Sequence, residues 1–192
     1  MKKILSLISF FVLFSISASA EQYIYSKGKC NQIINGKQTS VEYELQYDDS
    51  NGDIWFIRNV GKSFTAFLIS KSNMQNVRNA VSKYFEWEKI AVENQKTIQK
   101  DIADLNFESQ EIMSVYGQNR NNKVDIYFTF FSQTVKSHQF VIRGKKRTGN
   151  MEDYYFSKAQ AEEFSKLISE DSISEFKNRL SAQKQKENDL FN

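Results

Sequence analysis

Proline is absent from this chain of 192 residues, and cysteine and histidine occur once each. Because proline makes up about 5% of an average protein, its absence excludes proline-rich linkers and speaks against a second domain on a tether. Zinc sites need clusters of cysteine and histidine, and nothing in the sequence places Cys30 beside His138 as nucleophile and base. We therefore predict no metal and no assembled set of catalytic residues.

Glycine and charge of one sign are also scarce. The seven glycines form no glycine-rich run, so the sequence offers no phosphate-binding loop and we predict no cofactor. The net charge is +3, and it falls to about +1 if Lys2 and Lys3 are removed with a signal peptide. A domain that binds nucleic acid carries a strongly basic face, so we predict no nucleic-acid partner.

The N-terminus has the order of a secretory signal peptide. Lys2 and Lys3 precede an apolar run over 4–16, and a stretch of small residues ends at Ala20. This run is shorter than the roughly 20 apolar residues that a membrane-spanning helix needs. We therefore predict that residues 1–20 are a cleavable signal peptide.

The remaining chain, 21–192, has the usual size of one globular domain and is long enough to bury its own core. It contains no segment apolar enough to span a bilayer, so we predict a periplasmic or secreted protein without a transmembrane span. The oligomeric state is left open. So is the state of Cys30, which is a buried inert thiol, a site of intermolecular pairing or a reactive group.

Alternation of apolar and polar residues predicts strands. Residues 41–47 alternate in this way, and Asn51-Gly52 marks a hairpin turn before a returning strand. Weaker signals lie at 23–25 and 112–116. The predicted strands cover 41–47, 53–58, 63–69, 124–131, 138–143 and 154–156.

Apolar residues at three- and four-residue steps predict helices in three segments. The longest covers 73–95, and Ser72 with Gln75 has the spacing of a capping box at its start. Two C-terminal helices are predicted to open at Ser157 and Ser172. The predicted fold class is α+β, with an antiparallel sheet of about six or seven strands covered on one face by the long central helix and the C-terminal helices.

One repeat leaves a second arrangement open. Asp53-Ile54-Trp55-Phe56 recurs as Asp125-Ile126-Tyr127-Phe128, and Ser-Lys pairs at 70–71 and 157–158 each open a helix. The chain would then consist of two β-β-β-α halves. The plainer interpretation is that hairpins and amphipathic helices resemble one another by chance.

A basic cluster and an aromatic pair lie close together in the C-terminal third. The basic cluster favours an anionic partner such as a lipid headgroup or an acidic polysaccharide. A solvated loop is the plainer interpretation of the charges, and core packing that of the tyrosines. The candidate binding residues are Arg143, Lys145, Lys146, Arg147, Tyr154 and Tyr155.

The leading functional hypothesis is an exported, non-enzymatic binding or accessory protein whose partner lies in the cell envelope or outside the cell. It follows from a stable exported domain without an assembled catalytic set. The alternative is a hydrolase that acts on an envelope polymer through two carboxylates, one of them with a raised pKa. A third hypothesis is an interaction subunit that dimerises, with a covalent version through Cys30 as one form.

The export signal gives the first testable prediction. N-terminal sequencing of the exported protein will begin at Glu21, and Ala20→Tyr will leave the uncleaved precursor, because the cleavage site accepts only small residues. Ala20→Ser is the matched control and will be processed normally. A retained N-terminus in the unaltered protein would contradict the assignment.

Overall fold

The structure is a computed structural model that describes residues 21–102, 104–146, 149–150 and 152–190. The strands are β1 (Gln22–Ile34), β2 (Lys37–Asp48), β3 (Ile54–Val60), β4 (Ser63–Ile69), β5 (Gln99–Asp101), β6 (Phe107–Val115), β7 (Gln118–Thr134), β8 (Ser137–Lys146), β9 (Gly149–Asn150) and β10 (Tyr154–Ser157). The helices are α1 (Met74–Glu93), α2 (Lys158–Leu167) and α3 (Glu170–Asp189).

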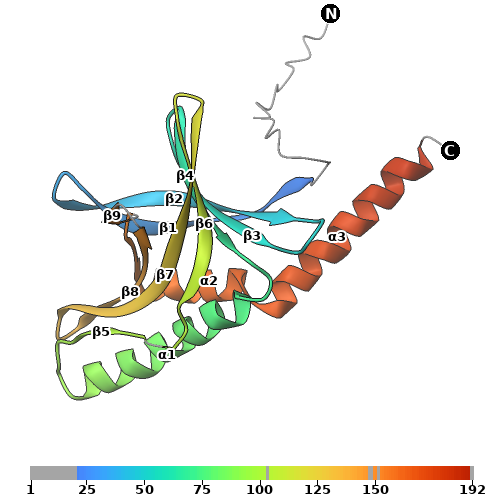
Figure 1. The fold of residues 1–192 in the computed structure, drawn as a ribbon. Coiled ribbons are helices and arrows are strands. Elements are labelled where there is room, and N and C mark those ends of the chain that lie inside the picture. Colours follow the sequence, from blue (N-terminus) through green and yellow to red (C-terminus); the bar gives the residue numbers. More distant parts are fainter. Residues whose placement is uncertain (1–20, 103, 147–148, 151, 191–192) are drawn as a thin grey trace, which may run out of the picture.

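Eight antiparallel strands form a closed barrel (Figure 1). Their order around the ring is β1, β2, β3, β4, β6, β7, β8 and β10; β7 pairs with β8, and β10 pairs back with β1. The short strands β5 and β9 are added to β7 and β8. A barrel of eight strands is just wide enough to be filled by side chains or to hold one small ligand.

The predicted fold class was therefore wrong. An open sheet covered on one face by a long central helix was expected, whereas the sheet closes on itself and side chains of α1 and α2 join its interior. The long helix itself was predicted at nearly the right residues. Periodicity shows which face of a strand is buried, but it does not show whether the two edges of the sheet meet.

The β-β-β-α halves, which the repeat left open, do not occur. The ring consists of two meanders with four strands each, β1 to β4 before α1, and β6, β7, β8 and β10 before α2. The repeated motif occurs at β3 and β7, which are the third strand of one meander and the second strand of the other. The two copies thus occupy non-equivalent strands.

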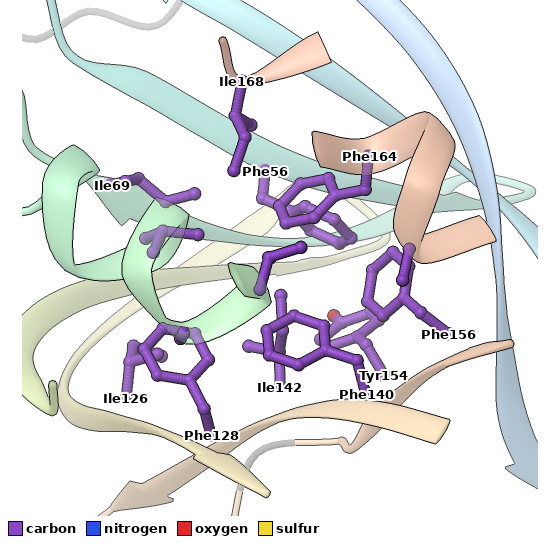
Figure 2. Packing of buried hydrophobic residues seen from close by; sticks show 14 of the residues in the cluster. Phe56, Ile69, Ile126, Phe128, Phe140, Ile142, Tyr154, Phe156, Phe164 and Ile168 are labelled. Carbon is purple, nitrogen blue, oxygen red and sulfur yellow. The ribbon is translucent and has the colours of Figure 1, made fainter. Parts of the chain in front are cut away.

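The core is a layer of aromatic side chains inside the barrel (Figure 2). Phe164 of α2 is fully buried, with its ring centroid 5.1 Å from that of Phe156 and 6.4 Å from that of Phe56. From α1, the hydroxyl of Tyr84 donates a hydrogen bond of 3.0 Å to the carbonyl oxygen of His138 in β8. The two helices thus supply side chains to the barrel interior.

The starts of the helices follow the capping prediction in one case of three. Ser157 is the N-cap of α2, as predicted, and it forms a capping box with Gln160. The N-cap of α1 is Asn73 rather than Ser72, and it makes no side-chain cap. The N-cap of α3 is Ser169, whose hydroxyl accepts from the backbone N–H of Ser172.

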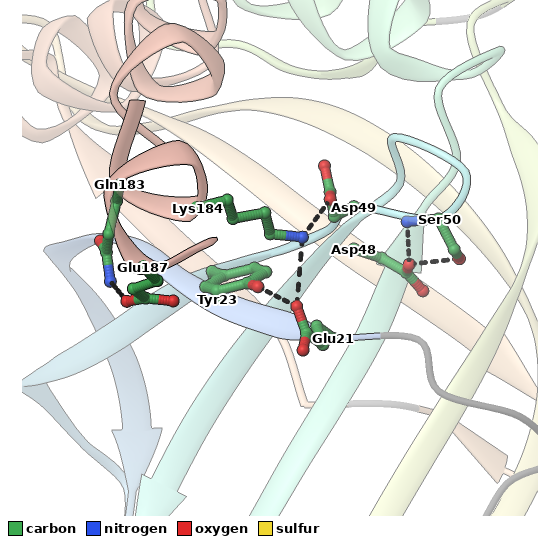
Figure 3. Close-up of polar contacts among 8 residues, drawn as sticks. All are labelled: Glu21, Tyr23, Asp48, Asp49, Ser50, Gln183, Lys184 and Glu187. Carbon is green, nitrogen blue, oxygen red and sulfur yellow. Dashed lines mark hydrogen bonds and ion pairs between the residues drawn. The ribbon is translucent and has the colours of Figure 1, made fainter. Parts of the chain in front are cut away.

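A lysine of α3 forms polar contacts with the start of the barrel (Figure 3). The ammonium of Lys184 lies 2.7 Å from a carboxylate oxygen of Asp49 and 3.1 Å from one of Glu21. It also lies 5.2 Å from the ring centroid of Tyr23, whose hydroxyl donates to Glu21. These contacts raise the pKa of Lys184, so the ammonium stays charged over the whole physiological range.

The predicted signal peptide, 1–20, lies outside the described residues, so its cleavage stays a prediction. No helix in the described part of the chain has both the length and the apolar character needed to cross a membrane.

The filling of the barrel by α2 is testable by truncation of Phe164. We expect Phe164→Ala to lower the free energy of unfolding by about 3–5 kcal/mol, because the surrounding strands cannot collapse into the cavity. Ile33→Ala is the control: this side chain is 60% exposed, and its loss will change stability by less than about 0.5 kcal/mol. Urea unfolding measures both. Equal losses of stability in the two variants would show that α2 does not fill the core.

Candidate functional site

Inward-facing side chains change from apolar to polar along the barrel. On β3 the buried Phe56 is followed two residues later by Arg58, and on β8 Ile142 is followed four residues later by Lys146. Because alternate residues of a strand point to the same face, these charged side chains point inward. We name the group they belong to the interior polar cluster. It consists of Gln32, Arg58, Glu111, Asn122, Lys146, Glu152 and Tyr154.

One half of the cluster is a buried ion pair. The Glu111 side chain is fully buried, and Lys146, only 12% exposed, places its ammonium 2.7 Å from a Glu111 oxygen. The side-chain amide of Asn122 donates to the same oxygen at 3.0 Å. Burying two charges is costly, and only a short contact with further hydrogen bonds offsets the cost.

The other half is centred on Glu152, in the loop before β10. One oxygen of Glu152 accepts from the side-chain amide of Gln32 at 2.9 Å and lies 3.2 Å from a guanidinium nitrogen of Arg58. The Glu152 side chain is 56% exposed and that of Arg58 is 10% exposed. This ion pair therefore connects a half-exposed carboxylate at the surface to a buried guanidinium inside the barrel.

Four polar atoms in this cluster are buried and have no hydrogen-bond partner among the described residues. They are Oε1 of Gln32, Nε of Arg58, Oε1 of Glu111 and the hydroxyl of Tyr154. Burial, followed by the charge of Glu152, raises the pKa of Tyr154, which keeps its hydroxyl protonated (Figure 2 shows this side chain). An unpaired buried polar atom costs about 1–3 kcal/mol, so each of the four favours a ligand atom or a water molecule beside it.

A hollow leads to this cluster at the seam between β1 and β10. These two strands share one register pair, Asn31 with Tyr155. We name the hollow of about 190 Å³ beside this pair the seam pocket. It is lined by Gln32, Ile33, Ile34, Glu152, Asp153 and Tyr155.

Four of the predicted binding residues lie around the seam pocket and the cluster. Lys146 and Tyr154 point into the barrel, where Lys146 pairs with Glu111. Arg143 and Tyr155 both contact Asp153 on the pocket wall. The Arg143 nitrogen Nε lies 3.2 Å from an Asp153 oxygen, and the Tyr155 hydroxyl donates to Asp153 at 3.1 Å.

The other two predicted residues do not join this group. Lys145 is exposed on the outer face of β8, between the inward-facing Gly144 and Lys146. Arg147 lies outside the described residues. Binding of an anionic partner by the basic cluster stays a prediction.

Cys30 and His138 have separate surroundings. Cys30 is completely buried, and burial raises the pKa of its thiol to about 12, so the thiol stays protonated at physiological pH and is a poor nucleophile. The imidazole nitrogen Nδ1 of His138 contacts the hydroxyl of Ser132 at 2.7 Å. No group of three His, Cys, Asp or Glu side chains suited to a metal ion occurs in the described ranges.

Sequence reasoning missed three members of the interior polar cluster. Gln32, Arg58 and Glu111 look like ordinary polar residues of exposed strand faces. Their inward orientation can be predicted only from a neighbouring residue that is known to point inward. Arg58 is two residues from Phe56, and Gln32 is two residues from Cys30.

No protein family, curated protein or solved structure matches this chain. The geometry described above is therefore the basis for a functional proposal.

The buried ion pair is testable by removing one charge. We expect Glu111→Gln to lower the free energy of unfolding by about 3–5 kcal/mol, because it leaves the Lys146 ammonium buried without a counter-charge. The matched control is Glu108→Gln on the same strand, which breaks an exposed pair with Lys123 and costs less than about 1 kcal/mol. Chemical unfolding compares them, and equal losses would refute a buried pair.

Proposed function

We propose that this chain is an exported, non-enzymatic binding protein that holds a small, neutral, hydroxyl-bearing ligand in the seam pocket. The carrying observation is the polar wall of this pocket, which Gln32 and Glu152 form. Oε1 of Gln32 is buried without a partner among the described residues, and Glu152 connects the pocket to the buried Arg58 behind it. A ligand hydroxyl suits this wall because it can donate to these oxygens.

The balance of charges favours a neutral ligand. The two carboxylates on the pocket wall are each paired with an arginine: Glu152 with Arg58, and Asp153 with Arg143. A charged ligand would have to break one of these pairs or remain uncompensated.

The size and lining favour one unit of a larger molecule. Pockets for drug-sized ligands have about 300–1,000 Å³, and the seam pocket has about 190 Å³. Ile33, Ile34 and the ring of Tyr155 give it an apolar wall, while Gln32 and Glu152 give it a polar one. A single sugar ring of an envelope polymer has this combination of an apolar face and a hydroxyl-bearing edge.

The hydrolase hypothesis gains no support from these contacts. Glu152 and Asp153, the two carboxylates on the pocket wall, are each already held in an ion pair with an arginine. Hydrolysis of an envelope polymer therefore stays an untested alternative, and the dimerisation hypothesis gains no support from Cys30 because its thiol is buried.

Titration with sugars, followed by NMR, tests the proposal. We expect N-acetyl-D-glucosamine or D-glucose to shift the backbone signals of Gln32 and Tyr155, and gluconate, a charged sugar acid, to bind more weakly. Gln32→Leu removes one hydrogen-bond partner and will weaken binding about ten-fold. Gln110→Leu, an exposed position on β6, is the matched control and will leave binding unchanged.

Two results would overturn this proposal. One is the absence of any shift at the seam with both neutral sugars. The other is an equal loss of binding in Gln32→Leu and Gln110→Leu, which would place the sugar elsewhere on the protein.

A further inference from the structure

Two hairpin turns project together at one end of the barrel, away from α1 and α2 (Figure 1). The first connects β3 to β4 at 61–62, and the second connects β6 to β7 at 116–117. The two turns lie side by side because β4 pairs with β6 as far as Phe64 and Ser114. We name the exposed apolar and basic residues at these turns the twin tip. They are Val60, Lys62, Val115, Tyr116 and Arg120.

The apolar side chains of the twin tip face solvent. Tyr116 is 82% exposed, and Val60 and Val115 are about half exposed. Val60 is two residues beyond the inward-facing Arg58, and Val115 is four residues beyond the inward-facing Glu111. Both valines therefore lie on the same face of the sheet, where the strands extend past the filled part of the barrel.

Tyr116 has a backbone conformation that tyrosine rarely adopts. Its φ is +51° and that of Gly117 is +83°, the two positive values of a type I′ hairpin turn. Asparagine followed by glycine favours this turn, and the β1–β2 turn has that pair, with φ of +52° at Asn35 and +74° at Gly36. A tyrosine in this conformation is strained, and its exposed side chain adds no packing inside the barrel. Fold stability therefore does not explain Tyr116, whereas a contact outside the chain would.

The charges of the twin tip are all positive. Lys62 and Arg120 are exposed, and neither forms an ion pair within the part of the chain that the structure describes. The segments 58–66 and 112–124 contain no aspartate or glutamate. The next carboxylate along β6 is that of Glu111, which is buried and paired with Lys146. The exposed apolar side chains therefore lie among cations whose charge is not neutralised.

The other hairpin turns lack this combination. The β1–β2 hairpin exposes Ile33, but this residue lines the seam pocket together with the carboxylates of Glu152 and Asp153, which repel an anionic surface. The turn at the other end of β7 exposes one apolar and one basic residue, Val135 and Lys136. The twin tip has three apolar and two basic residues.

We propose that the twin tip binds the surface of an anionic lipid bilayer. Lys62 and Arg120 contact lipid phosphate groups, while Tyr116 and the two valines enter the headgroup region. Tyrosine suits this depth because it has an apolar ring and a polar hydroxyl. Apolar and electrostatic contacts together give a reversible attachment, since each kind alone is weak. An acidic polysaccharide would match the cations but would leave the apolar side chains in water.

Co-sedimentation with lipid vesicles tests the proposal. The processed protein, beginning at Glu21, is mixed with vesicles of phosphatidylglycerol and phosphatidylcholine in equal parts, or of phosphatidylcholine alone. We expect the anionic vesicles to bind it about 25-fold more tightly, because two cations each contribute about five-fold, and we expect added salt to weaken this binding. In a second experiment, spin-labelled lipid will broaden the backbone NMR signals of Gly61 and Gly117 before those of the β7–β8 turn.

Substitutions assign the binding to the twin tip. Lys62→Gln and Arg120→Gln will each weaken binding to the anionic vesicles about five-fold. Lys136→Gln, at the other end of β7, is the matched charge control and will leave binding unchanged. Tyr116→Asn will weaken binding about five-fold through lost apolar contact. It will not lower the thermal unfolding midpoint, because asparagine favours the turn, and this separates binding from stability.

Four results would overturn the proposal. They are equal binding to anionic and neutral vesicles, unchanged binding by Tyr116→Asn, an equal loss in Lys62→Gln and Lys136→Gln, and binding to alginate, an acidic polysaccharide, without binding to either kind of vesicle. The third would mean that net charge rather than the twin tip determines binding, and the fourth would assign the cations to a polysaccharide. None of these results bears on the seam pocket, since that site is probed with neutral sugars and through Gln32.

Discussion

The pairing of β4 with β6 and of β1 with β10 joins two meanders into a closed ring, and the interior of that ring constrains the rest of the molecule. Each inward-facing side chain must fit a space about as wide as two opposed side chains. Aromatic residues and the α1 and α2 side chains fill one part of it. The remaining part is polar, and a closed barrel gives polar groups little access to water. Short ion pairs are therefore required there, such as that between Glu111 and Lys146.

The same closure bears on the position of the seam pocket. β1 pairs with β2 over almost its whole length but with β10 at one residue pair. A barrel with one weakly paired junction has one place where the interior can be reached at low cost, because few backbone hydrogen bonds oppose local opening. Glu152 lies at that junction and connects the half-exposed rim to the buried Arg58. The seam therefore combines a solvent-exposed rim with polar side chains of the barrel interior.

The sequence predicted the helices better than the sheet, for reasons that particular residues show. The apolar spacing of α1 depends on neighbours along the chain, and the structure places it at 74–93 against a prediction of 73–95. β1 was predicted at 23–25 but runs over Gln22–Ile34. Its inward positions include Gly28 and Gln32, which are small or polar and hide the alternation. Gly28 is required because a Cβ atom there would lie 2.3 Å from the Tyr43 hydroxyl.

Among the candidate binding residues, alternation along β8 separates charges that are neighbours in the sequence. The basic cluster was interpreted as a loop, but β8 continues to Lys146, so neighbouring lysines point to opposite faces. Lys145 is exposed on the outside, whereas Lys146 neutralises a buried carboxylate. Charges that look like one patch in the sequence are therefore divided between the outer surface and the barrel interior. Their partners, Glu111 and Asp153, come from β6 and from the loop before β10. Pairing within the second meander brings these segments near β8, because β10 pairs with β8 directly and β6 lies beyond β7.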